Sequence, residues 1–222
     1  MEKISAKVIE NRMETPTVCV LRLKADIKPH AAGQYVMVYV NNEMKPYSIA
    51  NVNEKDIVEL CIKVVPEGHV SNLMAKMKKG DELEISQPMG PFRLHEDTKN
   101  KIVFTATGTG VSSLKPMADF LLENDSREIW LFLGVKEEKE IIYRKHFEGL
   151  QKKHKNFHFV PVCSRDNSWK GEKGYVQDAI KKKIKSPKEF DVYLCGVKAM
   201  VDELKTIAEQ MGFANVYLEK YV

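Results

Sequence analysis

Two glycines flank a threonine in the stretch TATGTGVSSLKPM, residues 105–117, which follows an apolar run and precedes a helix-length segment. A glycine-rich turn of this kind lets backbone amides and a helix N-terminus approach an anion closely, as a dinucleotide pyrophosphate requires. The candidate residues are Thr107, Gly108, Thr109 and Gly110. The stretch matches neither GxGxxG nor GxxxxGK, so a strand-to-helix turn without a ligand is the alternative.

A second candidate lies in LCGVKAM, residues 194–200, after another apolar run. Cys195 and Gly196 fall at the carboxyl end of an expected strand, where ligands lie in open α/β sheets. The small, soft side chain of Cys195 is followed by a glycine, which has no side chain, so this position has room for a flat ring. Met200 lies four residues further along the chain. A cysteine that is simply buried is the alternative.

The polar stretch CSRDNSWKGEKGYV, residues 163–176, offers two cations and two hydroxyls. They are Ser164, Arg165, Lys173 and Tyr175. Such groups suit a phosphate monoester, because each charge-assisted hydrogen bond contributes roughly 1.5–3 kcal/mol. A solvated loop is the alternative.

The segment KPYS, residues 45–48, puts a cation, a ring and a hydroxyl at tight spacing directly after strand-like residues. A turn would explain the proline as the residue that fixes a bend, and a strand would explain the tyrosine. Neither element alone explains all four residues.

The first 95 or so residues alternate with the period of two that is typical of half-buried strands, as in residues 17–25, 34–40 and 56–65. Turn signals separate these runs, so we expect a small antiparallel barrel. One short helix is expected over residues 71–79, with Gly80 in the C′ position.

After residue 100, strand-like runs alternate with helix-length segments near 111–124, 138–153, 175–184 and 198–211. This alternation is typical of a parallel sheet with helices on its faces. The polar stretch HEDTKNK, residues 95–101, is the expected linker. We therefore predict two domains, an N-terminal antiparallel β-barrel over residues 1–97 and a C-terminal α/β domain over residues 98–222.

The chain has 222 residues, of which 43% are hydrophobic and 30% charged, with a net charge of +4. Its short lysine runs are typical of solvated helix ends, with a docking patch for an acidic partner as the alternative, and nucleic acid binding is not indicated. No apolar run approaches the roughly 20 residues of a membrane span, so we expect no membrane insertion and a cytoplasmic location. The four cysteines form no CxxC pair, and no metal site is expected.

In the order KPYS, GHVSNLM, GTG, CGVKAM and EKY, the chain resembles the ferredoxin–NADP reductase family of flavoproteins over nearly its whole length. The resemblance implies that the barrel binds FAD. In this family an Arg-x-Tyr-Ser motif holds the flavin, and Lys45 stands here in place of the arginine. By resemblance Lys45 contacts the phosphates, Tyr47 packs against the ring and Ser48 faces the ring nitrogen that accepts hydride. The neighbouring members of the motif are Pro46 and Ile49.

A second family motif, Gly-x-x-Ser, matches the start of the expected short helix. By resemblance this helix N-terminus binds the pyrophosphate, which favours FAD over the shorter FMN. The residues are Gly68, His69, Val70 and Ser71.

The resemblance also places a pyridine dinucleotide on residues 107–110 and its nicotinamide beside Cys195 and Gly196. The C-terminal acid and aromatic residue of the family match Glu219 and Tyr221, with the ring shielding the flavin. One further residue, Val222, follows the aromatic here, whereas plant-type members end on it. The implied catalytic residues are Ser48, Cys195, Glu219 and Tyr221.

The implied function is an NAD(P)H-dependent flavoprotein reductase that turns two-electron hydride transfer into one-electron steps. Its acceptor would be ferredoxin, another small redox protein or a diffusible molecule, and the protein would be a monomer or weak dimer. NADPH is favoured over NADH, because plant-type members grip the 2′-phosphate with a Ser-Arg pair and a Lys-x-Tyr at nearly this spacing. The alternatives are a flavin reductase and a non-catalytic electron-transfer or nucleotide-binding subunit.

Overall fold

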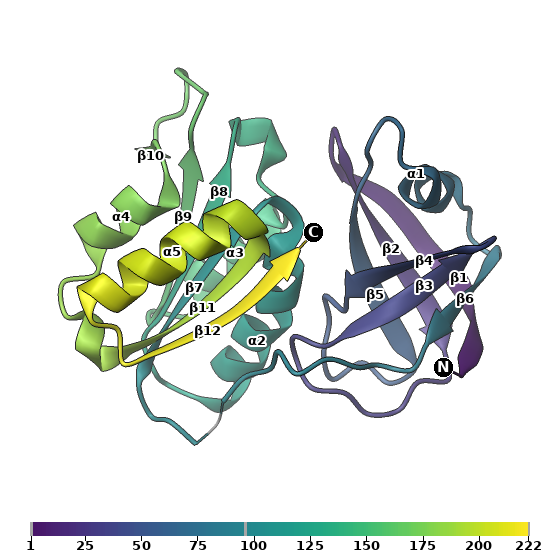
Figure 1. The fold of residues 1–222 in the computed structure, drawn as a ribbon, viewed down its shortest axis with the longest axis horizontal. Coiled ribbons are helices and arrows are strands. Elements are labelled where there is room, and N and C mark those ends of the chain that lie inside the picture. The colour runs from purple at the N-terminus through teal and green to yellow at the C-terminus, as the bar shows by residue number, and fades with distance from the viewer. Residues whose placement is uncertain (1, 96, 222) are drawn as a thin grey trace.

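The computed structural model describes residues 2–95 and 97–221, which form two six-stranded sheets in two side-by-side bodies (Figure 1). The first sheet has the strand order β4-β3-β6-β1-β2-β5, and the second has the order β10-β9-β8-β7-β11-β12. The predicted fold class, an antiparallel barrel followed by a parallel α/β domain, is confirmed.

The strands of the first sheet all pair antiparallel. They are β1 (Lys3–Thr15), β2 (Val18–Ala25), β3 (Tyr35–Val40), β4 (Glu43–Ser48), β5 (Ile57–Lys63) and β6 (Glu82–Ser86). A bridge between Ile49 and Leu60 joins the end of β4 to β5 and closes the sheet into a barrel. Alternate residues of these strands fill the barrel with an apolar core, as the period of two predicts.

The KPYS segment lies within β4 and makes no bend. Pro46 is paired with Met37 of β3, and β4 stands at the end of the strand order. Proline is tolerated on such a strand because its missing N–H group can face away from the ladder. The expectation that Pro46 fixes a bend is therefore wrong.

The short helix α1 (His69–Lys76) begins earlier and ends earlier than the sequence predicts. Met77 is its C-cap, and Gly80, with a φ of 101°, lies in a turn in which Asp81 N–H donates to the carbonyl of Lys78. The predicted C′ role of Gly80 is wrong, because its left-handed conformation serves the turn into β6 instead.

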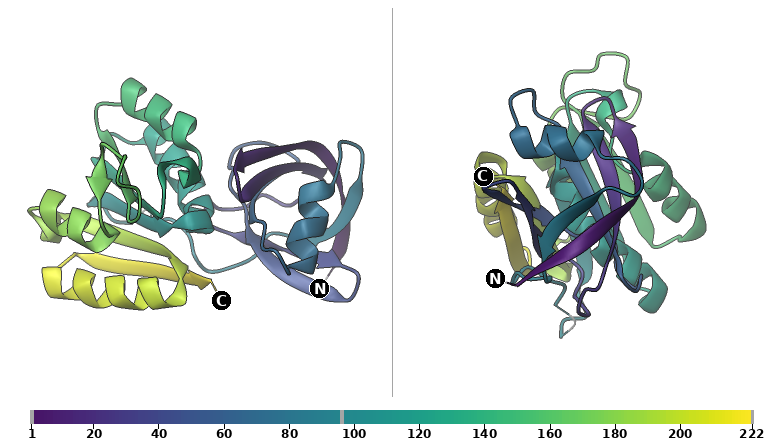
Figure 2. Two further views of the ribbon diagram at one scale, coloured as in Figure 1. Left: turned by 90° about the horizontal axis from the view of Figure 1, so that it is seen from above. Right: turned by 90° about the vertical axis from the view of Figure 1, so that its right-hand side faces the viewer.

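The second sheet is parallel throughout its described pairs. Its strands are β7 (Lys101–Thr107), β8 (Ile129–Val135), β9 (Phe157–Cys163), β10 (Glu172–Lys173), β11 (Phe190–Val197) and β12 (Asn215–Tyr221). Helices cover both faces (Figure 2), and they are α2 (Val111–Asn124), α3 (Arg144–Lys153), α4 (Val176–Lys183) and α5 (Lys198–Met211). Each face has its own apolar layer, one with α2 and α3 and the other with α4 and α5.

The single helix predicted over residues 138–153 is two elements. A 3-10 turn covers Glu138–Glu140, and α3 starts only after Tyr143, whose φ is 55°. Ile141, which is extended, and Ile142, which lies in a turn, are both buried between them. The amphipathic period could not reveal this break, because both isoleucines also suit a helix face.

The two bodies share a continuous apolar layer. Val18, Val20 and Cys61 of the barrel belong to the same buried cluster as Leu114 and Met117 of α2. The carboxyl end of β12 lies between the two bodies (Figure 1). Any site at the carboxyl edge of the parallel sheet is therefore also next to the barrel.

Within residues 2–95 and 97–221, no helix has both the length and the apolar character needed to cross a bilayer. The described residues of the expected linker precede β7 and form no helix or strand before Lys101.

Candidate active site

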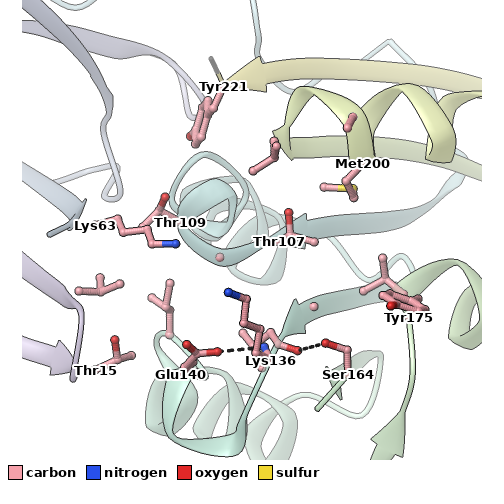
Figure 3. Close-up of a pocket in the computed structure, with 18 of the residues that line it drawn as sticks. Thr15, Lys63, Thr107, Thr109, Lys136, Glu140, Ser164, Tyr175, Met200 and Tyr221 are labelled. Carbon is pink, nitrogen blue, oxygen red and sulfur yellow. Dashed lines mark hydrogen bonds between the residues drawn. The ribbon is translucent and has the colours of Figure 1, made fainter. Parts of the chain in front are cut away.

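Two cavities meet at the junction of the two bodies. The larger, of about 990 Å³, runs along β4 and the start of α1. The smaller, of about 680 Å³, lies over the carboxyl ends of β7, β8 and β11 (Figure 3). Three residues line both cavities, namely Lys63, Thr109 and Tyr221. Ligands in the two cavities would therefore come together at Tyr221.

The larger cavity brings together two motifs that are separate in the sequence. Its lining includes Lys45, Pro46, Tyr47 and Ser48 of β4 and Gly68, His69, Val70 and Ser71 at the start of α1. Ile49 is the exception among the residues predicted there. It is 1% exposed, belongs to the barrel core and does not line the cavity.

The start of α1 is suited to a phosphate. Gly68 is the N-cap, no side chain caps the first turn, and the following residues face the cavity. A Cβ atom on Gly68 would lie 2.4 Å from Cγ2 of Val65 and 2.6 Å from Oγ of Ser71, so only glycine fits without movement. A helix start with open N–H groups attracts an anion. These residues fit the pyrophosphate of a flavin dinucleotide.

The smaller cavity contains the predicted glycine loop. Its lining includes Thr107, Gly108, Thr109, Ser164, Tyr175 and Met200. The buried Oγ1 of Thr107 has no hydrogen-bond partner among the described residues, so it is a polar atom that a ligand could satisfy. Figure 3 shows Lys63 and Lys136 reaching into this cavity from the two bodies. The loop, the unpaired hydroxyl and the two cations fit a dinucleotide.

Arg165 and Lys173, predicted to read a 2′-phosphate, do not line the cavity. Both are exposed, and Nζ of Lys173 donates to the carbonyl of Asn167 at 2.8 Å within its own loop. The carboxylate of Asp166 is also held locally, because it accepts from N–H groups of Glu138 and Ser168. Of the four residues predicted to bind the 2′-phosphate, Ser164 and Tyr175 line the cavity, whereas Arg165 and Lys173 do not.

Gly110, Cys195 and Gly196 are buried in the wall behind the cavity. A Cβ atom on Gly110 would lie 2.3 Å from the carbonyl oxygen of Cys195. Gly196 has a φ of 150°, and its Cβ atom would lie 2.7 Å from Oγ1 of Thr107. The glycine loop and the end of β11 therefore touch through backbone and form one rigid wall.

The four predicted catalytic residues converge on Ser113, a residue that the sequence did not single out. Oγ of Ser113 lies 2.9 Å from Oγ of Ser48, 2.9 Å from the hydroxyl of Tyr221 and 3.2 Å from Oε2 of Glu219. It also lies 3.4 Å from Sγ of Cys195. The signal available in the sequence was the adjacent pair Ser112 and Ser113 at the start of the expected helix, and the structure shows both buried in the first turn of α2.

Burial sets the protonation of these groups. It raises the pKa of Glu219 to about 7, although the hydrogen bond from Ser113 acts in the opposite direction. It raises the pKa of Cys195 to about 12 and that of Tyr221 well above its ordinary value. Glu219 therefore titrates near neutral pH, whereas the thiol of Cys195 stays protonated and is a poor nucleophile.

Comparison with known proteins identifies two domains in the chain. An oxidoreductase FAD-binding domain matches residues 5–94, and an oxidoreductase NAD-binding domain matches residues 104–206. The chain thus carries an FAD-binding domain followed by an NAD-binding domain.

Relatives include the CDP-6-deoxy-L-threo-D-glycero-4-hexulose-3-dehydrase reductase of Yersinia pestis, which is 33% identical over 89% of this chain and 63% of the relative. The crystal structure of the Amycolatopsis cytochrome P450 reductase GcoB has a TM-score of 0.92 and 27% identity, covering 99% of this chain and 69% of GcoB. The chain spans 59% to 67% of the length of the curated relatives it matches.

A ferredoxin NADP+ reductase from Neisseria gonorrhoeae, solved with FAD and NADP bound, shares the fold with a TM-score of 0.87. It is 20% identical, and the match covers 99% of each chain. The domain matches, the shared fold and the cavities at the two motif sets agree with one another. The chain belongs to the ferredoxin–NADP reductase-like family, with an FAD-binding barrel followed by an NAD-binding α/β domain.

Proposed function

We propose that the protein is an NAD(P)H-dependent flavoprotein reductase that passes electrons to a separate acceptor. The observation that carries the proposal is the meeting of the two cavities at Lys63, Thr109 and Tyr221. When bound, FAD would accept hydride from the nicotinamide and release the electrons singly. The protein itself binds and orients the two ligands and excludes water between them.

Each motif has a binding role in this proposal. Lys45 and the start of α1 hold the flavin phosphates, and Tyr47 packs against the ring. The loop of residues 107–110 holds the dinucleotide, with its nicotinamide beside Cys195 and Gly196. The proposed boundary between the two binding domains is between residues 97 and 98.

Ser113 connects Glu219, whose pKa burial raises to about 7, to Ser48 of the flavin cavity. A proton that leaves reduced flavin at Oγ of Ser48 can pass through Oγ of Ser113 to Oε2 of Glu219, across contacts of 2.9 and 3.2 Å. The hydroxyl of Tyr221 also contacts Ser48, at 2.7 Å. A flavin ring that enters beside Ser48 would replace Tyr221 as the partner of the Ser48 hydroxyl.

The proposed acceptor is a small redox protein or a diffusible molecule. Support comes from the names of the relatives, one the reductase of a dehydrase and another the reductase of a cytochrome P450. We also propose a cytoplasmic location, supported by four buried, unpaired cysteines, the state that thiols keep in a reducing compartment.

The proposal is tested on the purified full chain. Bound FAD should make the protein yellow, and anaerobic mixing with NADPH or NADH in a stopped-flow instrument should bleach it. Absence of bleaching with both nucleotides overturns the reductase and supports a non-catalytic subunit. Loss of all FAD on dialysis, with FAD still reduced in solution, supports a flavin reductase instead.

We propose NADPH as the preferred donor, with the exposed side chain of Arg165 turning toward its neighbour Ser164, which lines the cavity, to meet the 2′-phosphate. Arg165→Ala should then raise the KM for NADPH by about tenfold, the worth of a charge-assisted contact, and change the KM for NADH little. Steady-state kinetics with both nucleotides measures this. Equal changes for NADPH and NADH remove Arg165 as the phosphate reader.

Substitution of Lys45 is expected to have a smaller effect, on the affinity for FAD. A lysine ammonium cannot hold a pyrophosphate with two parallel hydrogen bonds, whereas a guanidinium can. Lys45→Arg should therefore tighten FAD binding by about threefold to tenfold, measured by titrating the apoprotein with FAD. Lys152→Arg, on the exposed side of α3, is the matched control. Unchanged affinity in Lys45→Arg would mean that residue 45 does not contact phosphate.

A further inference from the structure

A group of buried or half-buried polar side chains lies between the two bodies, outside the lining of both cavities. We call it the interdomain cluster and define it by Glu59 of β5, Lys115 and Asp119 of α2, and Tyr143 before α3. Glu59 and Lys115 are 8% and 9% exposed, and Tyr143 is 3% exposed. None of the four lines either of the two cavities, so cofactor binding does not account for them.

Lys115 connects α2 to the barrel segment that carries KPYS. Its Nζ donates to the carbonyl of Ala50 at 3.0 Å and to Oδ2 of Asp119 at 3.1 Å. Oε1 of Glu59 lies 4.0 Å from the same Nζ. Ala50 is only two residues beyond Ser48, whose Oγ contacts Ser113 of α2 at 2.9 Å. Two contacts from α2 therefore hold the segment at residues 48–50.

Tyr143 makes the second connection across the interface. Its hydroxyl donates to Oε1 of Glu59 at 3.0 Å, and its N–H donates to Oε1 of Glu14 at 3.0 Å. The left-handed φ of 55° costs a residue of this size conformational energy. Burial and the nearby acids raise the pKa of Tyr143 well above its ordinary value, so the hydroxyl remains a donor.

Asp119 completes the cluster on the α2 side. Nε2 of His146 lies 2.7 Å from its Oδ1, and Lys115 binds its Oδ2. Burial alone would raise the pKa of this carboxyl, but His146 and Lys115 outweigh burial and lower it. Lys115 thus has an anionic partner on its own helix and a carbonyl partner on the other domain.

These contacts differ in kind from the apolar layer around them. Apolar surfaces attract without a preferred direction, so they permit one domain to turn on the other. A buried ammonium that leaves its partners keeps its desolvation cost and loses the compensation. The interdomain cluster therefore selects one orientation of the barrel on α2.

We propose that Lys115 is a positioning residue, which fixes the two domains in the orientation that brings a flavin and a nicotinamide into contact. The kinetic part of this proposal rests on the proposed reductase function. Hydride transfer requires reacting atoms about 3–3.5 Å apart, and a misplacement of about 1 Å costs on the order of a hundredfold in rate. Loss of the cluster therefore affects the transfer step and leaves each separate binding site intact.

The test variant is Lys115→Met, which removes the charge and keeps an unbranched stem. We expect the rate of flavin reduction at saturating nucleotide to fall about tenfold. Binding of FAD and of the nucleotide should each change by less than about twofold, because neither cavity includes Lys115. Lys115→Arg keeps a cation and should recover part of the rate. Lys139→Met is the matched control, because Lys139 pairs with Glu137 on the surface.

A second measurement does not depend on activity. Both tryptophans, Trp130 and Trp169, belong to the second domain, so their fluorescence follows that domain while far-ultraviolet circular dichroism follows the whole chain. The two thermal transitions should coincide in the wild type and separate in Lys115→Met, because the interface no longer couples the domains. Glu59→Gln should separate them in the same direction.

Three results overturn the proposal: an unchanged reduction rate in Lys115→Met, a loss of FAD affinity that matches the loss of rate, or transitions that still coincide. A wild-type protein that nucleotide cannot reduce would overturn the proposed reductase function. The unfolding comparison would still decide whether the interdomain cluster holds the domains together.

Discussion

Gly110→Ala should lower the rate of flavin reduction about a hundredfold and weaken dinucleotide binding, because the added Cβ atom displaces the cavity wall. That atom would lie 2.3 Å from the carbonyl oxygen and 2.7 Å from the carbonyl carbon of Cys195. Both belong to the backbone of β11, so no side-chain rotation relieves the clash. The loop or the strand has to move, and both border the smaller cavity.

Gly149→Ala is the matched control. Gly149 lies inside α3, and a Cβ atom there would meet nothing within 4 Å. Alanine is favoured over glycine in a helix by about 1 kcal/mol, so this variant should keep full activity with equal or higher stability. Stopped-flow reduction and nucleotide difference spectra measure both variants. Wild-type behaviour of Gly110→Ala would show that the loop and β11 do not form a rigid wall.

Glu219→Gln should slow electron delivery to a one-electron acceptor about a hundredfold, the usual worth of a positioned proton acceptor, because reduced flavin loses a proton as it gives up its electrons. In the wild type the deprotonated fraction of Glu219 grows as the pH rises through its pKa of about 7, so the rate should rise there too. The variant cannot titrate, and its slow rate should not change across this range. A variant with the wild-type pH profile would exclude Glu219 as the proton acceptor.

Glu219 also predicts a dependence of stability on pH that needs no cofactor. Its pKa is about 7 in the folded protein and 4.5 ordinarily, so the folded state binds the proton more tightly. The stabilisation is complete below about pH 4.5 and is lost as the pH rises through about 7. The melting temperature of the wild type should therefore fall relative to Glu219→Gln between pH 5 and about 8. A constant difference would mean that the pKa of Glu219 is not raised.

The fold was predictable because its signals are local. Alternation marked the strands of the barrel, and the change to strand and helix alternation after residue 100 marked the parallel sheet. The motifs KPYS, GHVS and GTG also reach the two cavities, since each sits at the end or start of an element that points there.

The sequence did not reveal the direction of some side chains or the contacts between distant segments. Ile49 continues the KPYS motif, but its side chain lies in the barrel core. Arg165 has the expected spacing, although loop conformation, which no periodic pattern encodes, decides where its side chain points. Ser113 and Lys115 look like ordinary helix residues until α2 is placed against residues 48–50, which lie 65 positions earlier in each pair.

β12 is the last strand in the order of its sheet, and it pairs with β11 on one side. Release of its final residues breaks one strand ladder and the contacts of Glu219 and Tyr221 with Ser113, while the rest of the sheet stays paired, so local unfolding there costs less free energy than in a central strand. Tyr221, at the junction of the two cavities, is carried by this end. Amide hydrogen exchange should therefore be faster at residues 219–221 than in β7 or β11, and we expect the end of β12 to open first between the two cavities.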